Sequence, residues 1–490
     1  MLEKLAKQTA IYGVSTILVR FLSYLLTPFY TRVFGQEAYG IVTDIYALIP
    51  LALTLLTMGM ESSYFRFAAK ADEAGGDVGR AKQRLFTTTW TITTLAALLF
   101  VVVVSLGRSE IASWMGEAYV IHPEYISWVA LIILLDVSSA IPFARLREER
   151  RSMTFVGLKL VSVVINVALA FAFGAAGLFA TDFGVGWVFV ANLAASAITW
   201  LWLLGCTKCF RPAIDGALLR RILVYSLPLL VGGLAGTANE FLDRQLIKYL
   251  VPEGAMAELG IYGAITKIAV VMMLFYQMYR LAAEPFFLSN FKKEEFKEMN
   301  AAAMKYYLMA SMLIFLGIAL FRDLFALIVG RDFREGIHIL PVVLMSNVLA
   351  GVWLNLSFWY KREERTSLAI VVTVTGLLVT LPAGFALIPV LGYYGAAWMR
   401  LMSELTMVLV SLYLTRRFYP TPYAWGRILE YVGVALLLFV GAEWIGRWCG
   451  EVRIAAYGVN VVLFTGYVAY LIWRDKIDVK GMVRAVLKRK

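Results

Sequence analysis

The tetrapeptide Arg147-Glu148-Glu149-Arg150 occurs twice in this chain, and its second copy is Arg362-Glu363-Glu364-Arg365. A serine stands two positions after each copy, at Ser152 and Ser367. Each copy follows one long apolar stretch and precedes another. Because the pattern returns in the same surroundings, the sequence predicts that a large hydrophobic unit has been duplicated.

The composition is typical of a membrane protein. Of the 490 residues, 60% are apolar and only 16% are charged, and the mean hydropathy is +0.73. Apolar stretches of about 20 residues have the length of a helix that crosses a bilayer. The sequence therefore predicts an all-α polytopic membrane protein with about fourteen transmembrane helices. The predicted spans cover residues 9–33, 39–60, 85–106, 125–144, 153–173, 184–204, 222–247, 260–279, 301–321, 337–359, 368–389, 394–414, 428–445 and 455–473.

Lys and Arg are concentrated in alternate connectors, which sets the expected orientation. Cationic loops are retained in the cytoplasm, so an inside N-terminus places most of them there and leaves few outside, Lys248 among them. Both termini are then cytoplasmic, and the basic segment 474–490 is expected to lie at the headgroups. Basic loops beside anionic lipid also explain the net charge of +12, so no nucleic-acid partner is expected.

The two copies of the tetrapeptide are separated by six predicted spans. An even number gives both halves the same direction across the membrane, which predicts a pseudo-twofold axis along the membrane normal. A second echo supports the repeat, because Glu37-Ala38-Tyr39-Gly40-Ile41 and Glu258-Leu259-Gly260-Ile261 open equivalent spans. The expected domains are a six-helix bundle over 1–207, a second over 208–417, and two further spans with a tail over 418–490.

Residues for bond-breaking chemistry are missing from the sequence. It contains no Walker A pattern, no zinc signature and no nucleophile elbow. The longest expected outer connector, 107–124, is too short for a catalytic domain. We therefore expect no catalytic residue, no metal and no cofactor, and transport would be driven by a gradient or by consumption of the substrate.

Polar residues gather on four of the predicted spans, 9–33, 39–60, 222–247 and 260–279. A charge inside a bilayer costs several kcal/mol unless it faces a polar cavity or a partner, so each one needs a reason. These four spans are equivalent in pairs under the repeat, and spacings of three or four residues place their polar side chains on shared helix faces. The candidate site residues are Arg20, Tyr24, Asp44, Glu240, Asp243, Arg244, Lys267, Gln277 and Arg280.

The role of several of these residues can be interpreted in two ways. Arg20 either lines a substrate cavity or forms an internal ion pair, and a cation near a span end, such as Lys267, can instead reach the membrane surface. The glycines of the G-x-x-x-G at Gly232 and Gly236 favour either a hinge or close helix packing.

Diffuse motifs along nearly the whole chain resemble the polysaccharide-transport branch of the multidrug/oligosaccharidyl-lipid/polysaccharide (MOP) flippase superfamily, whose members are Wzx-like and MurJ-like. The stretches that carry the resemblance are Gln8-Thr9-Ala10-Ile11-Tyr12-Gly13, Pro28-Phe29-Tyr30-Thr31-Arg32-Val33-Phe34 with Tyr39-Gly40, Gly59-Met60-Glu61-Ser62-Ser63-Tyr64-Phe65-Arg66-Phe67, and Ser226-Leu227-Pro228 with Asp243-Arg244.

The resemblance implies a transporter of the bacterial inner membrane. Two six-helix bundles would form a cavity that opens to each side in turn and carries an undecaprenyl-pyrophosphate-linked oligosaccharide outward, with membrane lipids and glycan-assembly proteins as partners. Cations at Arg20, Arg244, Lys267 and Arg280 would neutralise the pyrophosphate, while Gln277 and aromatic residues such as Tyr24, Tyr46, Tyr262 and Tyr276 would complete the cavity. Coupling to the membrane potential, H⁺ or Na⁺ would involve Asp44, Glu240 and Asp243.

Two other functions remain open from the sequence. A drug or small-molecule:cation antiporter of the same superfamily would share the fold, but with twelve spans and a cavity rich in carboxylates. A membrane glycan polymerase or ligase is the enzymatic alternative, and the short outer connectors disfavour it.

Overall fold

The computed structural model describes residues 17–19, 21–207, 212–291, 293–365, 367–448 and 453–476. All regular secondary structure in this part is helical, as predicted. It holds twelve helical segments long and apolar enough to cross a membrane, and the interrupted pair α12 (Ala255–Ile268) and α13 (Val270–Asn290) forms a thirteenth. The first predicted span, 9–33, is described mainly as α2 (Leu26–Val33), and the basic tail lies largely outside the described residues. A count of fourteen therefore stays a prediction.

The chain packs into two compact units, and each is described by itself. Units are regions of dense packing, whereas the predicted bundles are sequence repeats, so these units do not test the bundle boundaries. Unit 1 comprises Met1–Lys267, Gly330–Phe333 and Thr373–Met399, and unit 2 comprises Ile268–Val329, Arg334–Val372 and Arg400–Lys490.

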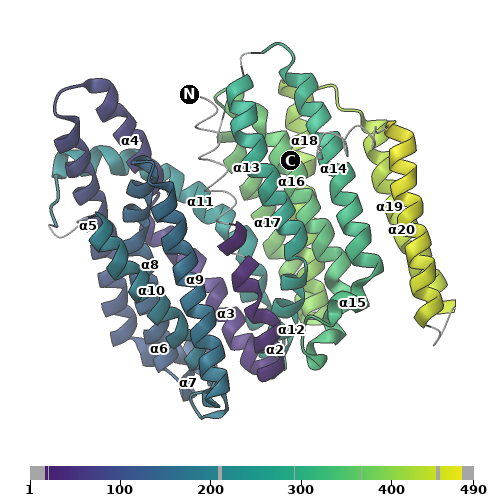
Figure 1. Cartoon of the computed structure of the whole chain (residues 1–490), viewed down its shortest axis with the longest axis horizontal. Coiled ribbons are helices and arrows are strands. Elements are labelled where there is room, and N and C mark those ends of the chain that lie inside the picture. Colours follow the sequence, from purple (N-terminus) through teal and green to yellow (C-terminus); the bar gives the residue numbers. More distant parts are fainter. Residues whose placement is uncertain are drawn as a thin grey trace. The chain divides into compact units, whose positions relative to one another are not determined.

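Unit 1 contains the helices from α2 to α12 (Figure 1). Most of α17 (Ser367–Leu391) and the start of α18 (Tyr393–Phe418) also belong to it. Its other elements are α3 (Gln36–Thr57), α4 (Met60–Ala74), α5 (Val78–Leu106), α6 (Arg108–Met115), α7 (Glu117–Ile121), α8 (Glu124–Glu148), α9 (Ser152–Ala175), η1 (Leu178–Ala180), α10 (Gly186–Thr207) and α11 (Gly216–Leu250).

Helix α11 runs antiparallel to α3 and α4 over much of its length. Near its start, a Cβ on Gly59 would lie 3.1 Å from the Ser226 carbonyl oxygen, and Gly59 has the positive φ of +67° that separates α3 from α4. Further along, the hydroxyl oxygens of Thr54 and Thr237 are 3.1 Å apart. A Cβ on Gly236 would meet nothing within 4 Å, so close packing does not explain that glycine here.

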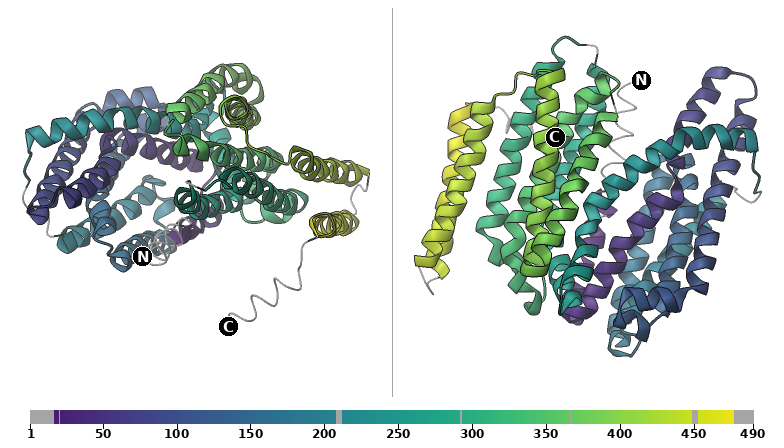
Figure 2. Two further views of the ribbon diagram at one scale, coloured as in Figure 1. Left: turned by 90° about the horizontal axis from the view of Figure 1, so that it is seen from above. Right: turned by 180° about the vertical axis from the view of Figure 1, so that it is seen from behind.

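Unit 2 is built around α14 (Phe296–Leu320) and α16 (Leu340–Arg362), which pack on each other. The final helices α19 (Trp425–Trp448) and α20 (Arg453–Asp475) lie side by side (Figures 1 and 2). Ion pairs tie them to each other and to the unit, at Glu430 with Arg474, Lys305 with Asp475, and Arg322 with Glu443. The remaining elements are α13, α15 (Arg322–Ala326), most of η2 (Arg331–Ile339), the start of α17 and most of α18.

Both copies of the repeated tetrapeptide form the same kind of turn. Each closes a long helix with a residue at φ +56°, Arg150 after α8 and Glu364 after α16. The next backbone N–H then donates to a carbonyl five residues back, from Arg151 to Leu146 at 2.8 Å and from Arg365 to Tyr360 at 2.7 Å. This is the Schellman arrangement of a helix C-terminus. The left-handed residue is the fourth of the first copy and the third of the second, so the repeat is shifted by one position.

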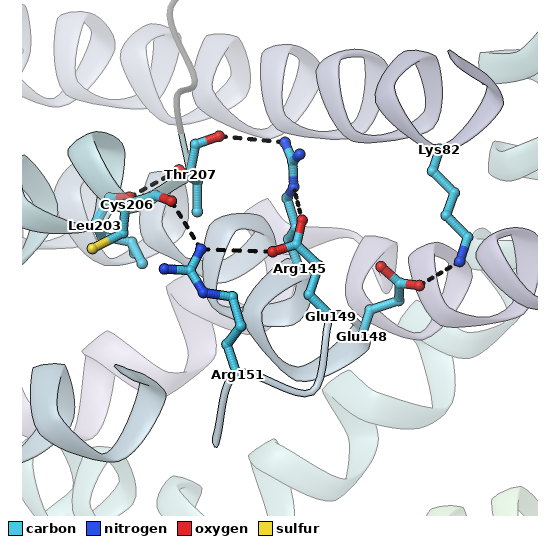
Figure 3. A network of polar contacts seen from close by, with 8 residues as sticks. All are labelled: Lys82, Arg145, Glu148, Glu149, Arg151, Leu203, Cys206 and Thr207. Atoms are coloured by element: carbon cyan, nitrogen blue, oxygen red, sulfur yellow. Dashed lines mark hydrogen bonds and ion pairs between the residues drawn. The ribbon is translucent and has the colours of Figure 1, made fainter. Parts of the chain in front are cut away.

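Charged side chains in and beside the first copy connect four helices of unit 1. Glu148 accepts from Lys82 of α5 at 2.6 Å, and Glu149 accepts from Arg145 at 2.7 Å (Figure 3). Arg151 reaches the Cys206 carbonyl oxygen of α10 at 3.0 Å, and Arg147 pairs with Glu61 of α4. We call this end of unit 1, where α8 and α4 end and α11 begins, the basic end.

Candidate functional site

A buried carboxylate on α3 is the centre of a buried polar network in unit 1. The Asp44 side chain is fully buried, and its Oδ2 lies 2.5 Å from Lys248 Nζ, whose side chain is 3% exposed. Tyr119 donates its hydroxyl to the same oxygen at 2.6 Å, and Gln245 Nε2 donates to Oδ1 at 2.7 Å. Both carboxylate oxygens are therefore engaged, and the buried charge is neutralised.

Three helices build this network. Gln245 and Lys248 are three residues apart on α11, so they share one helix face, and that face meets α3. Tyr119 comes from the five-residue helix α7, in the connector between two spans. Burial, together with the Asp44 carboxylate, raises the pKa of Tyr119 well above its ordinary value, so its hydroxyl stays protonated as a donor.

A second buried carboxylate, Asp243, lies one turn earlier on α11. It is 2% exposed, and its Oδ2 accepts from the Tyr262 hydroxyl of α12 at 2.5 Å. Its Oδ1 accepts from the Arg244 backbone N–H at 2.8 Å and from the Arg244 guanidinium at 3.0 Å. With Asp44 and Lys248, these residues make a charge-balanced set, which we call the carboxylate cluster.

Close backbone contact holds α12 against α3 beside this cluster. A Cβ on Gly40 would overlap the Met256 carbonyl oxygen, and one on Gly260 would overlap the Gln36 carbonyl oxygen and lie 3.1 Å from the Gly40 nitrogen. Gly40 and Gly260 are the equivalent glycines of the second sequence echo. The two similar segments therefore meet each other at these glycines.

The structure brings only some of the predicted site residues together. Asp243 and Arg244 are in direct contact, whereas Glu240 is exposed and offers Arg244 its backbone carbonyl at 3.0 Å. Lys267 is half-buried at the end of α12, with Nζ 5.4 Å from the centre of the Tyr39 ring. Arg20 lies outside the described residues, and Tyr24 is half-buried just before α2.

Two predicted residues belong to unit 2. Gln277 is half-buried on α13, and Arg280 is exposed on the same helix, with its Nε 3.7 Å from Glu284 Oε1. Glu284 also pairs with Lys361 at 2.6 Å. Of the residues expected to contact sugar, Tyr262 is fully buried against Asp243, and the Tyr46 hydroxyl accepts from Asn192 at 3.2 Å.

Lys248, Gln245 and Tyr119 were not among the residues predicted from the sequence. Charge asymmetry placed Lys248 on the outer side of the membrane and named no partner for it, and the structure buries it against Asp44. Spacing in the sequence could have identified Gln245 and Lys248. They follow Asp243 within the last two turns of α11, and a buried Asp44 needs a partner. Nothing in the sequence of the 107–124 connector pointed to Tyr119.

The cluster suits binding or switching better than bond breaking. Every carboxylate oxygen of Asp44 and Asp243 already has a donor, so an incoming cation or proton must compete with Lys248 or Arg244. Within the described residues, no group of three His, Cys, Asp or Glu side chains is arranged to hold a metal ion.

The sequence profile of the polysaccharide biosynthesis protein family matches residues 5–291, more than half of the chain. The chain belongs to this family. No curated protein sequence matches it.

Solved structures define the fold of this family member. A lipid II flippase MurJ structure, in an inward closed conformation, is 12% identical, with a TM-score of 0.75 over 95% of this chain and 99% of that one. An inward-facing multidrug resistance MATE transporter of the MOP superfamily is 14% identical, with a TM-score of 0.67 over 84% of this chain and 98% of its own. The MATE multidrug transporter DinF-BH, solved as a complex, is 13% identical, with a TM-score of 0.60 over 85% and 95%.

The comparisons confirm the predicted fold class and the resemblance to polysaccharide-biosynthesis proteins. The protein is an all-α, multi-pass membrane protein whose fold is similar to that of MurJ and of MATE transporters. The solved structures that it resembles are those of a flippase and of multidrug transporters.

Proposed function

We propose that the protein flips an undecaprenyl-pyrophosphate-linked oligosaccharide, the repeat unit of a surface glycan such as O-antigen or capsule, across the bacterial inner membrane by alternating access. Family membership supports a role in polysaccharide biosynthesis. The observation that carries the proposal is coverage, because the flippase fold accounts for 95% of the chain and the two MATE folds for 84% and 85%. The flippase structure therefore covers more of the chain than the MATE structures do, by about as many residues as α19 and α20 contain together.

The cargo has a charged head that must cross an apolar layer. Cations at Arg20, Arg244, Lys267 and Arg280 would neutralise the pyrophosphate on its way. An inside-negative membrane potential favours outward movement of an anion by about 2.3 kcal/mol per charge per 100 mV. The polyprenyl chain would stay in lipid while the glycan head passes.

Ion coupling would act through the carboxylate cluster. A proton or Na⁺ that binds Asp44 must displace the Lys248 ammonium group, and one that binds Asp243 must displace Arg244. The first exchange would weaken the attachment of α11 to α3. The second would release Arg244 within α11 itself, because Asp243 and Arg244 are neighbours on that helix. Cation binding would thereby change which helices are held together, which is the requirement for a coupled conformational step.

The proposal is tested with the purified full-length protein in proteoliposomes that contain a labelled undecaprenyl-pyrophosphate oligosaccharide. We expect the wild-type protein to move the lipid between leaflets, and we expect Arg20→Ala to abolish that movement at normal protein levels. Arg32→Ala, about three turns further along the same segment, is the control and should transport normally. Transport of a cationic dye without movement of the lipid would overturn the proposed function. Normal flipping by Arg20→Ala would remove the cavity role of Arg20.

A small-molecule:cation antiporter is the second candidate, because the MATE transporters have the same fold. The cation partners of Asp44 and Asp243 disfavour it, since an antiporter of this superfamily is expected to present unpaired carboxylates to its cavity. A glycan polymerase or ligase is disfavoured by the connector between α5 and α8, which is occupied by the short helices α6 and α7.

A further inference from the structure

Three cations gather around one aromatic pair at the basic end of unit 1. The rings of Phe67 on α4 and Tyr225 on α11 meet edge to face, with their centres 6.5 Å apart. The Arg66 guanidinium lies 4.0 Å from the centre of the Tyr225 ring. Lys70 Nζ and the Arg221 guanidinium lie 5.7 Å and 6.0 Å from the centre of the Phe67 ring. We call these five residues the cation–aromatic patch.

No carboxylate in the described chain lies within ion-pair distance of the three cations of the patch. Two acidic side chains of α4 form ion pairs with cations outside the patch, Glu61 with Arg147 and Asp72 with Lys82. The three cations are also exposed. Three positive charges this close repel one another, and attraction to the ring faces offsets only part of that repulsion. The patch therefore carries three positive charges without a negatively charged partner.

The helices that carry the patch are held rigidly. Below it, Met60 and Tyr64 of α4 and Ile222 of α11 are fully buried in one apolar cluster. The crossing is further fixed where Gly59 meets the Ser226 backbone. A binding surface held by its own packing loses little entropy when a ligand arrives.

The surroundings of the patch favour an amphiphile over a free anion. Exposed apolar side chains continue along α11 from the patch, at Val224 (72% exposed), Leu227 and Val231. Val224 and Val231 are seven residues apart and so lie on one face of the helix. A ligand that satisfies both parts of this surface has phosphate oxygens at one end and a hydrocarbon chain at the other.

We infer that the cation–aromatic patch binds the pyrophosphate of the polyprenyl-linked cargo when the cargo reaches this end of the protein. The inference rests on the proposed function and adds to it an arrival site separate from the carboxylate cluster. Two guanidinium groups and one ammonium group match a pyrophosphate better than a single phosphate, because arginine donates two parallel N–H bonds to phosphate oxygens.

The experiment measures binding of undecaprenyl pyrophosphate to the full-length protein in phosphatidylcholine nanodiscs. The variant Arg66→Gln/Arg221→Gln should bind this lipid at least tenfold more weakly than the wild-type protein. The control, Arg416→Gln/Arg417→Gln, removes the same charge from exposed positions at the end of α18 and should stay within twofold. Arg66→Lys/Arg221→Lys keeps the charges and should retain part of the affinity, which separates recognition from misfolding.

Phosphatidylglycerol and inorganic pyrophosphate distinguish the sources of the anion. Equal loss of phosphatidylglycerol binding in Arg66→Gln/Arg221→Gln would make the patch a general anionic-lipid site and overturn the inference. Full competition by inorganic pyrophosphate at the concentration of the lipid would also overturn it. Unchanged affinity for undecaprenyl pyrophosphate in Arg66→Gln/Arg221→Gln would contradict this inference and leave the proposed function intact. If the wild-type protein neither binds nor flips the lipid, the proposed function is also wrong. In the flipping assay, the variant should raise KM and leave kcat unchanged.

Discussion

Asp44 shows what a single charged residue requires inside a helical membrane protein. A carboxylate removed from water needs a counter-charge and hydrogen-bond donors, and Asp44 obtains them from Lys248, Tyr119 and Gln245. These donors come from two other elements, α11 and α7. One aspartate therefore organises the contact of three parts of unit 1, and its partners depend on it in turn.

Replacing Lys248 tests this dependence. Lys248→Met leaves Asp44 buried without its counter-charge, and breaking a buried pair from one side costs about 3 to 5 kcal/mol. We expect a clear drop in the melting temperature of the detergent-solubilised protein. Asp44→Asn/Lys248→Met removes both charges and should recover most of the loss. Arg80→Met, at a side chain that is 75% exposed, is the control and should melt like the wild-type protein. Equal melting temperatures for Lys248→Met and the wild type would mean that the pair contributes nothing.

At the scale of elements, α3 and α12 are joined by backbone contact at Gly40 and Gly260. Small residues at a helix crossing allow the two backbones to approach closely, and dispersion contacts then stabilise the pair. The opposing atoms are carbonyl oxygens of helices, which no change of rotamer can move aside. The crossing also sets where Tyr262 of α12 meets Asp243 of α11.

Adding one methyl group at this crossing should be costly. Gly40→Ala and Gly260→Ala each force α3 and α12 apart, and overpacking of this kind typically costs about 1 to 3 kcal/mol. Both variants should melt at lower temperature. Gly157→Ala in α9, where a Cβ would meet nothing within 4 Å, should be neutral or stabilising, because alanine favours a helix over glycine by about 1 kcal/mol. Similar melting of all three variants would show that the crossing tolerates side chains.

At the scale of the whole molecule, the long helices could be predicted from the sequence and the polar contacts could not, while the duplication stays a prediction. Hydrophobic length alone predicted nearly every long helix, since span length is set by the bilayer. Both copies of the repeated tetrapeptide form Schellman turns, which give helix ends the backbone partners that they need, but these turns were not predicted from the sequence. Lys248 was not predicted as the partner of Asp44, because a cation near a span end gives the same sequence pattern whether it reaches solvent or pairs inside the protein. Tyr119 escaped notice because its role depends on how a connector folds back, which periodicity does not encode.

The same duplication makes a prediction about sidedness. Six predicted spans separate the two turns, so both should face the cytoplasm. In a background with Cys206, Cys209 and Cys449 replaced by serine, Arg150→Cys and Glu364→Cys should react with a membrane-impermeant maleimide only in inside-out vesicles. Ser109→Cys, exposed in the connector between α5 and α8, should react only in right-side-out vesicles. Labelling of the two turns from opposite sides would rule out an even number of spans between them.

The meeting of Gly40 and Gly260 has a mechanical consequence. At Gly40 and Gly260 the two helices touch through backbone alone, so they can tilt about this point while remaining in contact. Gly40 is near the start of α3, a helix about 33 Å long at 1.5 Å per residue, and Gly260 is near the start of α12. A small tilt about this contact displaces each residue by an amount that grows with its distance along the helix. The side chains that travel furthest are those at the remote ends, and on α12 that side chain is Lys267.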